Sequence, residues 1–206
     1  MADMQSVRDD IAFMRALAEE GRSAPLLGGA ILVSAGLVFG AASLVHYAIT
    51  VGGRPLTPWI YPALWLGAGA VFMVILSVIR ARYRGRPGSL SPGNRAMQGV
   101  WRGVGIAIFT LFVVLGVAGW KLDDPVVFGL FPSAILVLYG AAWTLAAQMS
   151  EQKWMGVIAA VSFVCAALMP LLLGAAEMYL AYAAALALTA VLPGVLLMRQ
   201  EPTDVV

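Results

Sequence analysis

The sequence is poor in the residue types on which catalytic and metal sites usually depend. Charged residues make up only 12% of its 206 positions, against about 25% in a soluble globular domain. It holds one histidine, His46, and one cysteine, Cys165. A single cysteine excludes an intramolecular disulfide, and this pair cannot supply the ligands of a zinc or bis-histidine haem site within one chain. We therefore predict no catalytic residue, no metal ligand and no cofactor, and a protein that is not an enzyme.

Long apolar runs take the place of charge, since 61% of the residues are hydrophobic. Six runs of 18 to 31 residues carry no charged side chain: 23–53, 55–79, 103–120, 125–150, 154–176 and 178–198. A helix needs about 20 apolar residues to cross the hydrocarbon of a bilayer. Continuous apolar runs also exclude a transmembrane barrel, whose strands alternate in polarity. The sequence therefore predicts an all-α fold in the lipid bilayer, a six-helix transmembrane bundle made of three helical hairpins.

The predicted organisation has three parts. Residues 1–22 form a short amphipathic cytoplasmic helix, 23–200 the six-helix transmembrane domain and 201–206 a C-terminal tail. The predicted spans are 26–49, 58–79, 101–120, 126–148, 154–174 and 178–198. Trp101 and Trp154 are expected at the inner membrane interface, because tryptophan is enriched where a helix meets the headgroups.

The distribution of basic residues predicts the orientation. With six spans both termini lie on one side, and that side carries 11 of the 13 lysines and arginines, leaving only Arg54 and Lys121 on the other. Basic residues favour the cytoplasmic side. We expect a multi-pass protein of a bacterial inner membrane with cytoplasmic N and C termini. The net charge of only +2, with no basic helix face, argues against direct nucleic-acid binding.

The N-terminal helix carries an apolar stripe that could dock on a protein. The stripe consists of Val7, Ile11, Met14 and Leu17, with Phe13 beside it. Five acids against three arginines between Asp3 and Arg22 give this segment a charge of −2, which disfavours anionic lipid. Its partner is therefore expected to be the underside of its own bundle or a cytoplasmic protein.

Residues 80–95 are predicted to form a flexible basic loop, because a basic cluster is combined there with proline, glycine and serine. Its basic cluster comprises Arg80, Arg82, Arg84 and Arg86. These arginines either fix topology or also touch anionic headgroups, at about 1 kcal/mol each.

Two glycine pairs at a spacing of four residues predict close helix packing: Gly36 with Gly40, and Gly99 with Gly103. In lipid, such small-residue faces let helix backbones approach each other. We expect both pairs to pack within the chain, and a homodimer seam stays open as the alternative.

No acid or base lies in the middle of any predicted span, which argues against a proton relay. The polar side chains expected there are Ser34, Thr110, Tyr139, Ser162 and Thr189. Each of them can hydrogen-bond to a helix carbonyl or to a neighbouring helix. Trp65, Tyr139 and Trp143 are candidates for lining a cavity, and core packing is the alternative for these rings.

The stretch "DDIAFMRALAEEGR" leading into "SAPLLGG" resembles the opening of small uncharacterised bacterial six-span integral membrane proteins. The resemblance covers about 25 residues and the six-span plan. Such proteins tend to be encoded beside winged-helix regulators, so it implies a membrane-tethered regulatory role and brings no catalytic or ligand residue.

Two functions therefore remain. The first is a non-enzymatic membrane anchor or sensor that engages a partner through its N-terminal helix and basic loop. The second is a subunit that binds or transports a neutral or amphiphilic solute, similar in size and span number to the substrate-binding components of energy-coupling-factor transporters. A deep cavity lined by Trp65, Tyr139 or Trp143 favours the second function, and a tightly filled bundle favours the first.

Overall fold

The computed structural model describes residues 7–8, 10–12, 28–53, 57, 59–83 and 92–200. Within these ranges the chain is helical and contains no strand, and six helical segments are long and apolar enough to cross a membrane. The first five are α2 (Gly29–Val51), α3 (Ile60–Tyr83), α4 (Pro92–Leu122), α5 (Phe131–Ser150) and α6 (Lys153–Leu168). The sixth combines α7 (Glu177–Leu186), the π-helical η3 (Ala187–Val191) and α8 (Leu192–Gln200). Two 3₁₀ turns, η1 (Pro125–Leu130) and η2 (Met169–Leu172), complete the described elements. The predicted all-α six-helix bundle is confirmed.

The third span differs most from its predicted bounds. We predicted residues 101–120, whereas α4 begins at Pro92 and runs 31 residues to Leu122. Proline is well suited to the first position of a helix, where its missing N–H has no partner to lose. Arginine is a good helix former, so Arg95 and Arg102 extend the helix rather than ending it. Because α3 also continues to Tyr83, both ends of the predicted basic loop are helical.

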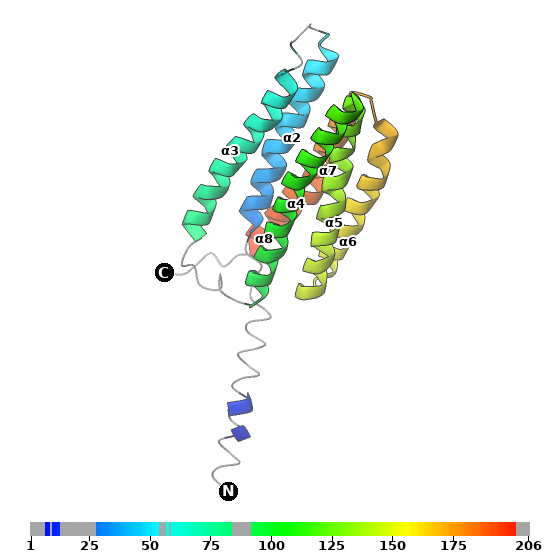
Figure 1. Ribbon diagram of the computed structural model, residues 1–206. Helices are drawn as coiled ribbons and strands as arrows, with labels where there is room; N and C mark the ends of the chain where they lie inside the picture. The colour runs from blue at the N-terminus through cyan, green and yellow to red at the C-terminus, as the bar shows by residue number, and fades with distance from the viewer. Residues whose placement is uncertain are drawn as a thin grey trace.

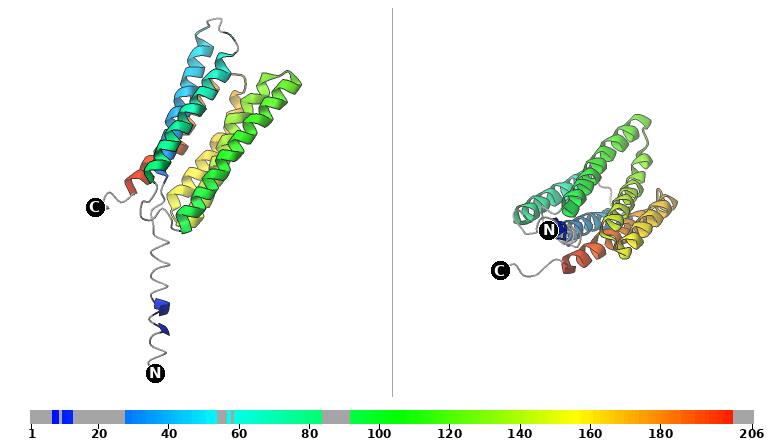
Figure 2. Two further views of the ribbon diagram at one scale, coloured as in Figure 1. Left: turned by 60° about the vertical axis from the view of Figure 1, so that its left-hand side comes forward. Right: turned by 90° about the horizontal axis from the view of Figure 1, so that it is seen from below.

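The helices form two groups that lean apart (Figures 1 and 2). In the first, α2 is central and packs against α3, α7, η3 and α8. In the second, α5 packs between α4 and α6, and α6 joins the groups through η3. Among the described elements, only α2 packs extensively against α3. Helices α3 and α4 are accordingly the two spans least covered by the rest of the described chain.

The two ends of the bundle differ in charge. At the end where α2 begins and α3 ends, the described residues include six basic side chains and one acid: Arg80, Arg82, Arg95, Arg102, Lys153, Arg199 and Glu151. We call this the basic end. At the opposite end the described charges are Lys121, Asp123, Asp124 and Glu177. The basic end therefore has the more positive electrostatic potential and attracts anions.

The glycine pairs behave differently from one another. A Cβ atom at Gly36 would lie 2.5 Å from Val191 Cγ2, so this glycine allows close packing of α2 on η3, as predicted. Gly40 is buried, but the space around its Cβ position is open. Gly99 and Gly103 lie on an exposed face of α4 that no described residue covers. The intramolecular packing predicted for this second pair is not found among the described residues, where the main contacts of α4 are with α5 and η1.

The start of α2 lies very close to α8, and we expect this contact to be sensitive to a single methyl group. A Cβ at Gly29 would lie 2.5 Å from the backbone oxygen of Gly194, so Gly29→Ala should destabilise the bundle by about 1–3 kcal/mol. Gly40→Ala on the same helix is the control, because nothing lies within 4 Å of its Cβ position. Unfolding in detergent should separate the two variants, and equal stability would contradict the close approach.

Candidate functional site

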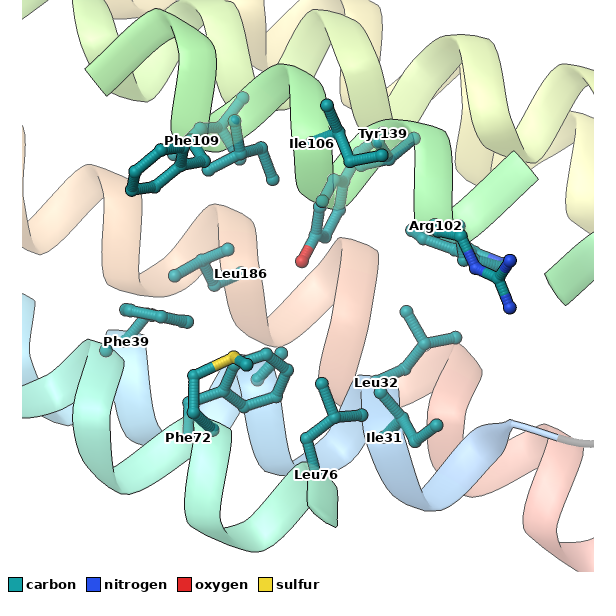
Figure 3. A pocket seen from close by; sticks show the side chains of 18 of the residues that line it. Ile31, Leu32, Phe39, Phe72, Leu76, Arg102, Ile106, Phe109, Tyr139 and Leu186 are labelled. Atoms are coloured by element: carbon teal, nitrogen blue, oxygen red, sulfur yellow. The ribbon is translucent and has the colours of Figure 1, made fainter. Parts of the chain in front are cut away.

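A cavity of about 1110 Å³ lies between the two groups of helices (Figure 3). Its walls come from α3 on one side and α4 on the other, and α2, α5 and α7 form its floor. This volume is slightly above the range of about 300–1,000 Å³ typical of small-molecule sites. Since α3 and α4 are the least covered spans, the cavity faces sideways, toward the position of the lipid around a transmembrane bundle.

Aromatic and aliphatic side chains make most of the lining. Figure 3 shows Phe39 and Phe72 from the first group facing Ile106 and Phe109 from α4, with Leu186 between the two sets. Apolar walls of this kind lose dispersion contacts when nothing fills the space between them. The cavity therefore suits an apolar chain.

The three candidate cavity residues of the sequence are brought together. Trp65 from α3 and both Tyr139 and Trp143 from α5 line this cavity. Trp101, predicted at the inner interface, lies in the lining as well, with ring centroids 5.5 Å from Tyr139 and 5.7 Å from Trp143. Its position follows from the early start of α4, which places residue 101 well inside the helix rather than at its end.

The indole of Trp143 is fixed by an irregular turn in the last span. Its Nε1–H donates to the carbonyl of Thr189 at 2.9 Å, and the ring is only 1% exposed. Pro193, four residues after Thr189, has no N–H, so this carbonyl lacks its usual α-helical donor. The tryptophan supplies the missing donor and thereby joins α5 to the π-helical turn η3. One face of the cavity floor is held rigid by this contact.

Four of the five polar side chains predicted in mid-span are satisfied by their own helices. Each donates to a carbonyl four residues back at 2.7–2.9 Å: Ser34 to Ala30, Thr110 to Ile106, Ser162 to Ile158 and Thr189 to Ala185. These side chains are structural.

Tyr139 is the fifth, and it differs from the others. The residue is 6% exposed, and its hydroxyl makes no hydrogen bond within the described part of the chain. In Figure 3 the hydroxyl oxygen points from α5 into the cavity. Tyr182, 3% exposed, also lines the cavity without a hydrogen bond to any described residue. The two residues are buried as a whole, and their hydroxyls can bond to a polar atom of a molecule bound in the cavity.

Two arginines from facing helices lie at the basic end of the cavity. Arg80 of α3 and Arg102 of α4 both belong to its lining, and both are exposed. Within the described residues neither guanidinium forms an ion pair or a hydrogen bond. In Figure 3 Arg102 lies at the end near Ile31 and Leu32, and it extends away from Phe109. The cavity thus has an apolar body and a positive mouth.

An aromatic cluster lies at the end of the cavity opposite the two arginines. His46 Nδ1 accepts a hydrogen bond from Trp65 Nε1 at 3.1 Å, and its ring stacks on Tyr179 at a centroid distance of 3.6 Å. Tyr61 lies 4.5 Å from the same imidazole. His46 therefore positions Trp65 by connecting α2, α3 and α7. No group of three metal-binding side chains occurs among the residues described.

We expect His46→Phe to loosen this end while keeping its stacking. The variant leaves the Trp65 indole N–H without its acceptor, and the free energy of unfolding should fall by about 0.5–1.5 kcal/mol. Tyr47→Phe on the same helix is the control, because its hydroxyl bonds to no described residue. Thermal unfolding in detergent checks both variants, and an unchanged His46→Phe would show that the hydrogen bond contributes nothing.

The remaining candidate residues are only partly described. Val7 and Ile11 are helical and 51% and 47% exposed, whereas Phe13, Met14 and Leu17 lie outside the described residues. In the basic cluster Arg80 and Arg82 are described and exposed, and Arg84 and Arg86 are not described.

Comparison with family models, curated proteins and solved structures gave no match. The six apolar helices make this chain a multi-pass membrane protein. Its functional class has to be inferred from the cavity.

Proposed function

We propose that this protein binds an elongated apolar or amphiphilic molecule, which reaches the cavity between α3 and α4 sideways from the bilayer. The observation that carries the proposal is the cavity itself, about 1110 Å³ in volume and lined by Trp65, Tyr139 and Trp143. A bundle acting only as an anchor has no need of such a space, because close packing of its helices is more stable. Binding or transport of an amphiphile is therefore better supported than a purely anchoring role.

The chemistry of the lining supports binding rather than catalysis. It combines aromatic rings and aliphatic chains with Gln98, the tyrosine hydroxyls and two arginines. Such a set holds a ligand by apolar contact and orients it by a few polar groups, as small-molecule sites do.

The orientation with cytoplasmic termini in a bacterial inner membrane belongs to the same proposal. It is supported by the excess of basic residues at the basic end, which would then be cytoplasmic. The N-terminal helix would lie on this side and could report occupancy of the cavity to a cytoplasmic partner. The exposed apolar side chains of Val7 and Ile11 suit such a contact.

A neutral brominated amphiphile tests the proposal, because bromine quenches tryptophan fluorescence at close range. Three tryptophans line the cavity, namely Trp65, Trp101 and Trp143. We expect dibrominated diacylglycerol, added to protein in an uncharged detergent, to quench their emission with a saturable one-site curve. Quenching that rises linearly to the end of the titration would indicate partition into the micelle and would contradict a binding site.

A further inference from the structure

We infer that the ligand of this cavity is an anionic phospholipid, with its phosphate between Arg80 and Arg102, an ester carbonyl at Tyr139 and an acyl chain along α4. The inference rests on the proposed function and names the chemistry of its ligand. Three features of the site carry it: the level of the two arginines, the unpartnered tyrosine hydroxyl and the length of the apolar body.

The two arginines lie at the level expected for a headgroup. Arg80 ends the charge-free run 55–79, and Arg102 begins the charge-free run 103–120, so each marks the boundary of its apolar segment at the basic end. Arg80 from α3 and Arg102 from α4 both belong to the lining of the cavity, so their side chains border the same space. Guanidinium groups that have no partner among the described residues, on both sides of a cleft, suit a phosphate, which each can bind in a bidentate manner.

The hydroxyl of Tyr139 is placed to donate a hydrogen bond to an ester carbonyl of a glycerophospholipid. Trp101, next to Arg102 in the chain, lies edge-on against Tyr139 with centroids 5.5 Å apart, so the tyrosine is close to the arginine end of the cavity. Its hydroxyl is inside the apolar lining and has no described partner. A phospholipid carries ester carbonyls just below its phosphate. A carbonyl there would accept the hydrogen bond that Tyr139 does not make within the described chain.

The apolar body has the length of one leaflet. From Arg102 to Phe112, the lining of α4 rises by about 15 Å. Half of a hydrocarbon core of about 30 Å is about 15 Å. An acyl chain in the cavity therefore spans the same depth as the chains of its neighbours in the leaflet at the basic end. The lipid can enter without leaving its leaflet.

Three brominated lipids test the inference in an uncharged detergent: phosphatidylglycerol, zwitterionic phosphatidylcholine and diacylglycerol. We expect phosphatidylglycerol to bind at least tenfold more tightly than the other two. Arg102→Gln and Arg80→Gln should each reduce this preference about tenfold or more, because each weakens phosphatidylglycerol binding far more than diacylglycerol binding. Arg82→Gln is the matched control, because Arg82 is exposed on the same helix as Arg80 but lies outside the cavity lining.

Tyr139→Phe separates the carbonyl contact from the phosphate contact. Since diacylglycerol and phosphatidylglycerol share the ester, this variant should weaken both by a similar factor and keep the preference between them.

The other outcomes are distinct. Equal binding of all three lipids, insensitive to either arginine, would overturn the inference and leave the proposed function standing. A brominated fatty acid that binds more tightly than phosphatidylglycerol would replace the phospholipid by a free carboxylate. If no lipid binds saturably, the proposed function fails as well.

Discussion

Gly105→Trp should abolish saturable binding of an amphiphile without unfolding the bundle. Gly105 lines the cavity from α4, and no atom lies within 4 Å of the position that its Cβ would take. The position therefore accepts a Cβ atom, and a tryptophan there would extend into space that the ligand needs. We expect affinity for diacylglycerol and phosphatidylglycerol to fall at least tenfold, or by about 1.4 kcal/mol or more.

Gly103→Trp is the matched control for this prediction. Gly103 lies on the same helix two residues earlier, has open space around its Cβ position and does not belong to the cavity lining. The two variants change composition, hydrophobicity and helix propensity equally. Equal binding by both, measured by quenching and by unfolding in detergent, would show that the cavity is not where the ligand lies.

Trp143→Phe should cause a large loss of stability for a substitution that keeps an aromatic ring. The variant removes the indole donor from the carbonyl of Thr189, a residue that is fully buried. Leaving a buried carbonyl without a donor costs about 1–3 kcal/mol, and the smaller ring adds a cavity term. Trp101→Phe is the control, because its indole bonds to no described residue.

A second substitution separates the two contributions to this loss of stability, the missing hydrogen bond and the smaller ring. Pro193→Ala restores a backbone N–H four residues after Thr189, where an α-helix would use it for the orphaned carbonyl. The double variant should therefore be more stable than the sum of the single effects by about 1 kcal/mol, measured as a double-mutant cycle. Strict additivity would show that the carbonyl is satisfied in another way.

The helices could be predicted from the sequence because a long charge-free run identifies the part of a helix that can lie in the hydrocarbon. Six charge-free runs predicted six helices, and five of the six agree with the predicted spans within a few residues. The start of α4 could not be predicted, because arginine both favours helix and reaches the headgroups with its long side chain. The glycine pair of α4 was misjudged since spacing identifies a small-residue face but not the helix that covers it.

The cavity could be predicted only in part. The residue types of Trp65, Tyr139 and Trp143 suggested a lining, but the space among them arises because the α2–α3 pair leans away from α4 and α5. No periodicity in the sequence encodes that separation. The pairing of Trp143 with Thr189 had a signal that sequence reasoning missed, since Pro193 leaves one identifiable carbonyl without a donor. For the N-terminal stripe, Phe13, Met14 and Leu17 lie outside the described residues, so its docking role stays a prediction.

Native mass spectrometry of the protein released from its own membrane tests the central claim most directly. An amphiphile-binding cavity predicts one adduct per chain, of a single lipid class, that survives removal of the detergent. The Gly105→Trp variant, whose new side chain occupies the cavity, should be detected at the mass of the chain without a lipid adduct. A bare wild-type chain, or the same mixed lipid adducts on wild type and variant, would contradict the account.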